Sequence, residues 1–369
     1  MTKKLKPSPE MKRSLDEFVE QRDSLKFKEH ADLQRAARAA KAEAREATEK
    51  MQSLEKRLGF YEKMDSIPLV VPEWLTPKGP TKKHHGTPCV AISDWHSGEW
   101  VEPSQVGGIN AYSRAICDAR LQRAFEGTIT VARDYLKGVE YDGVQVFLPG
   151  DNVSGNLHEE LIASNEGTVF ENVMSMAEGF IAGLTLLAKD FGRVNVACVV
   201  GNHGRRTMKP VYKNRAQDSF DWLIYRIVEQ RLSADKRITL NVSPAIDASV
   251  TLYSTRFLLF HGDEMRGGGG ISAELAPLLL GIHRKTRQKQ AEGAAFDCAV
   301  LGHFHSLLFL PSKSIIVTGC GIGPSEYGYG KGYTPEAPQC ALFLVTPEKG
   351  ISAFAPVFVA DPVAEGWGK

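Results

Sequence analysis

The sequence predicts an α/β (α+β) protein built on a sheet that helices cover on both faces. Two observations favour this class. Short apolar runs bounded by turn residues recur through the second half of the chain, at residues 89–92, 144–148, 196–200, 257–260 and 298–301. Longer amphipathic stretches, typical of helices, separate several of these runs.

Each of the five runs ends in a polar segment rich in Asp, Asn and His. Because open α/β sheets bind ligands beyond the carboxyl ends of their strands, we expect these segments to meet at one rim of the sheet. Together they supply seven candidate metal ligands: Asp94, His96, Asp151, Asn202, His261, His303 and His305.

Oxygen and nitrogen donors of this kind suit Mn²⁺, Fe²⁺ or Zn²⁺ and argue against a sulfur-rich structural zinc site. Seven ligands are too many for one ion but suit two ions that share a bridging carboxylate. We expect Mn²⁺, with Fe, Zn or Mg as alternatives. A single Asp-x-His or Gly-Asp also fits an ordinary turn or a helix cap, so the prediction depends on all five segments occurring in this order.

That order, Asp-x-His, Gly-Asp, Gly-Asn-His, His and Gly-His-x-His, resembles the calcineurin-like metallophosphoesterase superfamily over roughly residues 88–320. Within it the chain is most similar to the SbcD-type DNA-repair exonuclease branch, in a version that a phage or prophage would encode. The resemblance implies a four-layer fold, a two-sheet β-sandwich flanked by helices.

The resemblance also implies roles for single residues. Asp94, His96, Asp151 and His305 would hold one ion. Asp151, as the bridge, would hold the other together with Asn202, His261 and His303. His203 matches the position that protonates the leaving oxygen. The family often has Asp or Glu after that histidine, whereas this chain has Gly204, so what orients His203 is left open.

Composition sets outer limits on the class of protein. The 369 residues are 43% hydrophobic, enough for one large domain and an appendage, and the net charge of +1 means that any basic surface must be local. Six scattered cysteines without a Cys-x-x-Cys pair are expected to be reduced core residues. No apolar run approaches the roughly 18 residues that span a membrane, so we expect a cytoplasmic protein of a bacterium or a phage-infected cell.

Residues 1–64 are predicted to be helical. Small and apolar residues recur with heptad spacing at Leu33, Ala37, Ala40, Ala44, Ala47, Met51, Leu54, Leu58 and Tyr61. This spacing favours a coiled coil that forms a homo-oligomer through residues 33–61, with a single long helix as the alternative. A proline-rich linker is expected over 65–87, the catalytic domain over 88–360 and a C-terminal tail over 361–369.

Further elements follow from pattern. Helices are expected over 110–137, 159–189 and 217–232, and strands over 307–310 and 315–318. Strands over 340–346 and 351–359 are expected to complete a second sheet.

Several segments are candidate substrate contacts. Arg205 and Arg206 follow directly on His203 in a loop with five cations, which is either a solvated loop or a phosphate-binding one. His158 is either a surface or helix-capping residue or a phosphate contact. The glycines 267–270 suggest a mobile rim, and the basic residues 283–289 are either one wall of a groove or a solvated helix face. Tyrosines in the loop 319–339 either stack on unpaired bases or pack on the protein itself.

The expected mechanism is metal-assisted hydrolysis of a phosphate ester, with Arg205 or Arg206 offsetting charge and His203 donating a proton to the leaving alkoxide. The expected substrate is DNA or RNA, cut by an exonuclease or an endonuclease. The alternatives are a phosphomonoesterase or cyclic-nucleotide phosphodiesterase, and an inactive metal-binding scaffold. An ATPase partner is implied by the resemblance alone.

Overall fold

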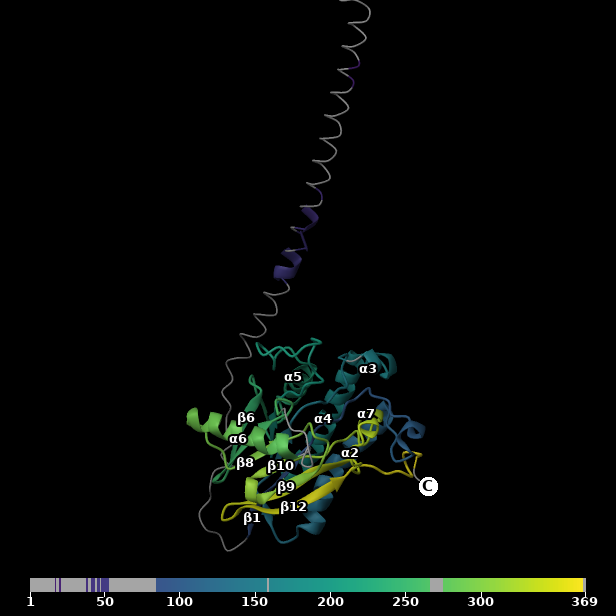
Figure 1. Ribbon diagram of the computed structural model, residues 1–369. Coiled ribbons are helices and arrows are strands. Elements are labelled where there is room, and N and C mark those ends of the chain that lie inside the picture. Colours follow the sequence, from purple (N-terminus) through teal and green to yellow (C-terminus); the bar gives the residue numbers. More distant parts are fainter. Residues whose placement is uncertain are drawn as a thin grey trace, which may run out of the picture. The chain divides into compact units, whose positions relative to one another are not determined.

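The structure is a computed structural model that describes residues 84–157, 159–265 and 275–367, together with helical positions between residues 17 and 52 (Figure 1). The chain divides into two compact units, Met1–Pro68 and Leu69–Lys369. In the first unit the described positions are helical, and Met51 is the described member of the predicted heptad seam, with 59% of its surface exposed. The other heptad positions, residues 65–83 of the expected linker, His158 and the glycines 267–270 lie outside the described residues.

The second unit contains two sheets. The first has the order β12-β11-β1-β3-β4-β5, with β2 beside β1. In this sheet β1, β3, β4 and β5 run parallel, and β11 is antiparallel to β1. Its strands are β1 (His85–Ala91), β2 (Glu140–Tyr141), β3 (Val144–Leu148), β4 (Val194–Cys198), β5 (Ile238–Val242), β11 (Gln339–Thr346) and β12 (Gly350–Phe358).

The second sheet has the order β6-β7-β8-β10-β9. Here β7, β8 and β10 are parallel, and β6 and β9 form antiparallel edges. Its strands are β6 (Asp247–Leu252), β7 (Thr255–Phe260), β8 (Cys298–Leu301), β9 (Leu308–Leu310) and β10 (Ile315–Val317).

The alternation of side chains along each strand produces the layers. In β3, Val146 faces the helices on the outer face of the first sheet, whereas Phe147 faces the second sheet. In β7, Leu259 faces the first sheet, whereas Leu258 and Phe260 face helix α6 (Leu275–Ala291). The central strands β3 and β7 therefore bury apolar side chains on both of their faces.

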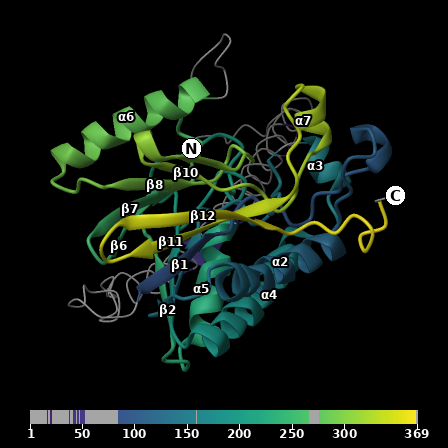
Figure 2. The same cartoon turned by 90° about the horizontal axis from the view of Figure 1, so that it is seen from below.

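Helices cover the two outer faces. The first sheet packs against α2 (Arg114–Thr130), α4 (Val169–Phe191) and α5 (Phe220–Leu232), and the second packs against α6. Figure 2 shows α6 on one side of the strands and α2, α4 and α5 on the other. Shorter helical segments are η2 (Pro103–Val106), η3 (Val131–Tyr135), α3 (Glu159–Ser164), η4 (Pro311–Lys313) and α7 (Glu326–Gly330). The four layers expected of the fold are thus present.

Three expectations about the elements are wrong. The five strands with polar ends belong to two sheets, not one. The closing strands β11 and β12 join the first sheet, because β11 buries Leu342 against the helices and Phe343 against the second sheet and so needs a central position. The helix expected over 159–189 breaks into α3 and α4, where Thr168 and Glu171 form a capping box.

All five strands with polar ends form at the expected positions in the sequence. Strands β5 and β6 were not predicted. All six cysteines are free and buried. In the described parts of the chain, no helix combines the length and the hydropathy needed to cross a bilayer.

The segment 361–367, expected to be a tail, is tied to α2. The carboxylate of Glu365 accepts hydrogen bonds from Arg120 and Arg123, and the side chains of Arg120 and Glu365 are 0% and 2% exposed. Arg120 also donates to the carbonyl oxygens of Gly321 and Ile322, at 3.0 and 2.7 Å. Both of those residues donate their backbone N–H groups to the carbonyl oxygen of Asp94. The C-terminal segment therefore helps to hold the first candidate ligand.

Candidate metal centre

The seven predicted ligands lie just beyond the carboxyl ends of five strands, β1, β3, β4, β7 and β8. Backbone hydrogen bonds join the loops that carry them. Asp94 N–H donates to the Gly150 carbonyl at 3.1 Å, and His96 N–H donates to the Asp151 carbonyl at 3.0 Å. In the second sheet, Gly302 N–H donates to the His261 carbonyl at 3.0 Å. The ligands of each sheet are thus fixed relative to one another.

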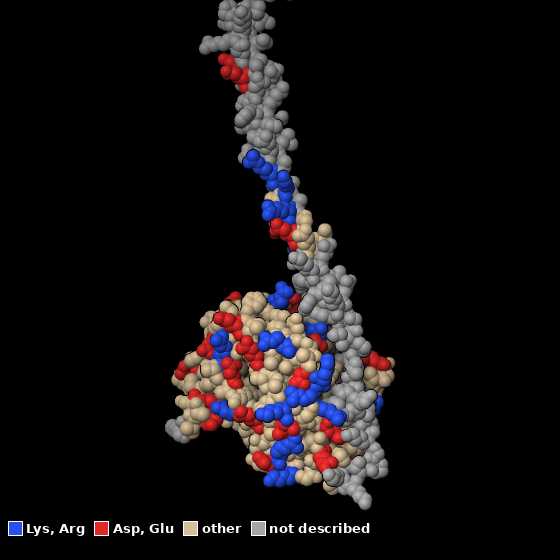
Figure 3. Space-filling view, turned by 180° about the vertical axis from the view of Figure 1, so that it is seen from behind, with Lys and Arg blue, Asp and Glu red and all other residues tan. Residues whose placement is uncertain are grey.

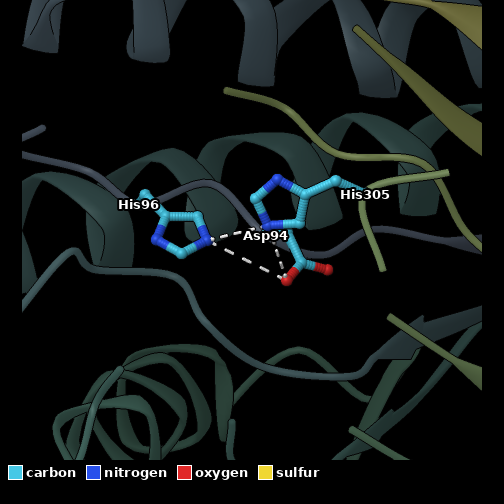
Figure 4. A group of neighbouring side chains, drawn as sticks. All are labelled: Asp94, His96 and His305. Atoms are coloured by element: carbon cyan, nitrogen blue, oxygen red, sulfur yellow. Dashed lines mark hydrogen bonds and ion pairs between the residues drawn. The ribbon is translucent and has the colours of Figure 1, made fainter. Parts of the chain in front are cut away.

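A first group consists of Asp94, His96 and His305. The Nε2 atoms of the two histidines are 3.2 Å apart, and they lie 3.9 and 3.5 Å from Asp94 Oδ1. Figure 4 shows both rings directed toward the Asp94 carboxylate. Because His305 follows β8 and Asp94 follows β1, this group joins the two sheets.

A second group consists of Asp151, His261 and His303. His261 Nε2 lies 3.0 Å from Asp151 Oδ2 and 3.1 Å from the side-chain oxygen of Asn202. The His261 and His303 rings meet edge to face, with centroids 5.1 Å apart. Asn202 therefore belongs with this group, as the resemblance implies.

Asp151 links the two groups. It also belongs to a third set with His96 and His203, and in each set the donor atoms lie within 4.8 Å of one another. Asp151 is therefore close both to His96 of the first group and to His261 of the second. This is the position expected of a bridging carboxylate.

The donors fit a cation. Asp94 Oδ2 accepts the backbone N–H of His303 at 3.0 Å, but Asp94 Oδ1 is fully buried and has no hydrogen-bond donor among the described residues. A buried carboxylate oxygen without a partner is costly, and it points at a positive ligand. The His261 imidazole is also oriented from behind, since it donates from Nδ1 to the Pro149 carbonyl at 3.1 Å and leaves Nε2 facing the site.

Five of the seven ligands adopt left-handed backbone conformations. The φ angles of Asp94, His96, Asp151, His303 and His305 are 55°, 46°, 53°, 69° and 54°. Such conformations cost about 1 kcal/mol or more per residue and gather at functional sites. All five lie in the loops that follow the strands, where the chain turns at the edge of each sheet.

The site keeps its carboxylates ionised. Burial alone would raise the pKa of Asp94, but the neighbouring His305, whose Nε2 lies 3.5 Å from Oδ1, lowers it to about 2. Burial likewise opposes ionisation of Asp151, and the charges of His261 and His203 hold its pKa well below the usual value. Anionic oxygens are what divalent ions require.

His203 is oriented by a backbone carbonyl. Its Nδ1–H donates to the Ser154 carbonyl oxygen at 3.0 Å, and its backbone N–H donates to Asp151 Oδ1 at 2.7 Å. Its ring lies edge to face with that of His96, at 4.4 Å between centroids. The question that Gly204 left open thus has an answer. A Cβ at position 204 would lie 2.9 Å from Asp221 Oδ2. Gly204 therefore leaves room for the carboxylate of Asp221, which comes from α5 and not from position 204.

Asp221, in the first turn of α5, was not among the predicted residues. Its carboxylate is fully buried, and it accepts backbone N–H bonds from Asp151, Asn152 and Gly201 at 3.1, 2.9 and 2.9 Å. Burial and the charge of Asp151 raise its pKa. No local sequence signal marks this role, since an acidic residue near a helix start has an ordinary reading.

The two arginines predicted to contact substrate, Arg205 and Arg206, make different interactions. Arg205 donates from its guanidinium to the carbonyls of Asn202, Thr207 and Met208, and Arg206 pairs with Asp218 at 2.8 Å on the surface. Arg215, which was not singled out, is 11% exposed in its side chain and pairs with Asp263 at 2.6 Å.

The second basic cluster is also partly neutralised. Lys285 and Lys289 are buried on α6 and pair with Asp247, at 3.2 and 2.9 Å. Lys285 also pairs with Glu264 at 2.9 Å. The groove expected between this cluster and the Arg205 loop therefore loses two of its cations.

No family model matches the sequence, and no curated protein matches it. Among solved structures, similarity is found to a conserved uncharacterized protein of Streptococcus pneumoniae TIGR4, described as a predicted phosphoesterase, with 12% identity and a TM-score of 0.28 over 73% of this chain and 98% of the other. Wild-type Vps29 of Entamoeba histolytica complexed with Zn²⁺ gives 12% identity and a TM-score of 0.29, over 73% and 99%. Because these TM-scores are low, the functional proposal rests on the site itself.

Proposed function

We propose that this chain is a metal-dependent phosphoesterase whose substrate is a phosphodiester of DNA or RNA. The observation that carries the proposal is the meeting of two donor groups that share Asp151, each formed by carboxylate and imidazole side chains. The sequence motifs of the calcineurin-like superfamily supply these same residues in the same order.

Asp94, His96, Asp151 and His305 would hold one divalent ion, and Asp151, Asn202, His261 and His303 would hold the other. When bound, two such ions activate a water and offset the charge that develops on the phosphoryl oxygens. We propose Mn²⁺, because the carboxylate and amide oxygens of the set suit this ion and no thiolate is present to favour zinc.

His203 is the proposed general acid. Since its Nδ1–H is held by the Ser154 carbonyl, Nε2 is the nitrogen that can donate a proton to the leaving oxygen. Its place in a set with His96 and Asp151 puts it beside the bridging ligand.

A nucleic acid strand is favoured by local features, not by overall charge. On the face shown in Figure 3, basic and acidic side chains are interspersed. The exposed rings of Tyr327, Tyr329 and Tyr333, at 66%, 54% and 57%, offer stacking surfaces for unpaired bases. Their loop is tied to the centre, because Gly321 N–H donates to the Asp94 carbonyl and Glu336 accepts the N–H of Leu307 at 2.9 Å.

A small phosphomonoester or cyclic nucleotide is the second candidate. It is favoured by the pairing of Lys285 and Lys289 with acidic residues, which leaves less positive surface for a long strand.

The test is hydrolysis by the purified chain with Mn²⁺, on bis-p-nitrophenyl phosphate, p-nitrophenyl phosphate, single-stranded DNA and RNA. We expect turnover of the diester and of at least one nucleic acid, loss of both with excess EDTA and recovery with Mn²⁺. Hydrolysis of p-nitrophenyl phosphate with DNA and RNA left intact would favour the second candidate. No hydrolysis of any substrate with both ions bound would show that the proposal is wrong.

A further inference from the structure

A small hollow that is open to solvent lies beside Asn202, one of the candidate ligands. The loop that follows His203 forms most of its wall. Asp263, two residues after His261, completes the lining. Its polar lining consists of Asn202, Arg205, Thr207, Lys213, Arg215, Asp218 and Asp263. The pocket therefore adjoins the second donor group.

Arg215 is the most firmly placed cation of this wall. Its NH2 group lies 2.6 Å from Asp263 Oδ1, and both side chains are nearly buried, at 11% and 13% exposed. Burial lowers the pKa of Arg215, but the charge and hydrogen bond of Asp263, with the charges of Glu264 and Asp151, raise it overall. Asp263, which holds the guanidinium, lies two residues after His261, a ligand of the second donor group.

Arg215 also has N–H donors that its pairing with Asp263 does not use. A guanidinium has five N–H groups, and within the part of the chain that the structure describes, Asp263 is the hydrogen-bonding partner of Arg215. In Arg205, by contrast, each of the three guanidinium nitrogens donates a hydrogen bond to a carbonyl oxygen of the same loop. Arg215 can therefore offer a planar fork, the geometry that matches two phosphate oxygens.

The charges of the lining favour an anion. The lining contains three cations, Arg205, Lys213 and Arg215, and two carboxylates. Of the carboxylates, Asp263 pairs with Arg215, and Asp218 pairs with Arg206 outside the lining. A substrate with a single phosphate would place it at the metal centre and leave this pocket without an anionic group. A strand carries a second phosphate next to the one that is cut.

We infer that this pocket binds the phosphate neighbouring the scissile one, with Arg215 as its main ligand, so that it selects a nucleic acid strand over a monoester. The inference rests on the proposed function. In this role Arg215 is a specificity residue and takes no part in bond breaking.

The test compares the full-length chain with Arg215→Gln, loaded with Mn²⁺, on two substrates. Bis-p-nitrophenyl phosphate has one phosphate, and a short single-stranded oligonucleotide has several. The control is Arg237→Gln, which removes a more exposed Arg–Asp pair of the same 2.6 Å length, with Asp235, just before β5.

We expect Arg215→Gln to lower kcat/KM on the oligonucleotide by about tenfold, mainly through KM, and to reduce the salt dependence of binding by about one phosphate contact. Its kcat/KM on bis-p-nitrophenyl phosphate should stay within about twofold of wild type. Arg237→Gln should match wild type on both.

Equal losses on both substrates would overturn the inference, because Arg215 would then only position Asp263 and His261. Unchanged kinetics on the oligonucleotide would overturn it as well. If Arg215→Gln does not fold, Arg215→Lys keeps the charge without the fork, and a loss confined to the oligonucleotide is again expected. A wild type that hydrolyses neither substrate would instead sink the proposed function.

Discussion

The carboxylate of Asp221 accepts the backbone N–H of Asp151 at 3.1 Å, across 70 positions of sequence. The same carboxylate accepts the N–H groups of Asn152 and Gly201, so one buried acid fixes the two loops that follow β3 and β4. Asp151 has a φ of 53°, and Asn202 follows Gly201 directly. Asp221 therefore positions ligands without being one.

Asp221→Asn should weaken both the fold and the metal site. An amide keeps one acceptor oxygen but turns an NH2 group toward backbone donors, which leaves buried N–H groups unpaired. We expect a loss of about 2 to 3 kcal/mol in the free energy of unfolding, measured by urea denaturation. Mn²⁺ affinity, measured by calorimetry, should fall together with it. Unchanged stability and affinity would show that the hydrogen bonds of Asp221 are dispensable.

His203→Gln should slow hydrolysis in a way that depends on the leaving group. A nucleoside alkoxide needs a proton as it leaves, whereas p-nitrophenolate leaves readily without one. We expect kcat on an oligonucleotide to fall about 100-fold or more and kcat on bis-p-nitrophenyl phosphate to fall far less. Metal content should be measured alongside. Equal losses on the two substrates would argue that His203 serves the metal site and is not a general acid.

The buried pair between Arg120 and Glu365 should make stability depend on pH. Burial alone would raise the pKa of Glu365, but hydrogen bonds from Arg120 lower it. A carboxylate whose folded pKa is depressed stabilises the fold above its unfolded pKa of about 4.3, and the effect is lost as pH falls through the folded value.

Glu365→Gln should therefore cost about 3 kcal/mol in the free energy of unfolding near pH 7, because it leaves a buried guanidinium unpaired. The difference from wild type should shrink as the pH is lowered past about 4. Glu348→Gln, in the exposed β11–β12 turn, is the control and should change little. A difference between Glu365→Gln and wild type that stays constant with pH would contradict the assignment.

The sequence predicts those features that depend on local pattern. The run at 144–148 forms β3 with the expected bounds, because apolar residues there lie between Gly143 and Pro149. The polar segments after the strands predict the two donor groups. The break at Thr168 was missed, although Thr168 and Glu171 carry the spacing of a capping box.

Features that depend on distant contacts could not be predicted. Whether β11 joins the first or the second sheet depends on which partner buries both of its faces, and its own apolar residues fit either sheet. Their position next to His203 in sequence favours Arg205 and Arg206 over Arg215 as substrate contacts. The fold instead pairs Arg215 with Asp263, 48 positions away.

The central claim is that two cations share Asp151, and anomalous diffraction from crystals soaked in Mn²⁺ tests it most directly. We expect two manganese peaks on either side of the Asp151 carboxylate, one among Asp94, His96 and His305 and the other among Asn202, His261 and His303. A map without manganese at these residues, or with a single ion that Asp151 does not touch, would contradict the account.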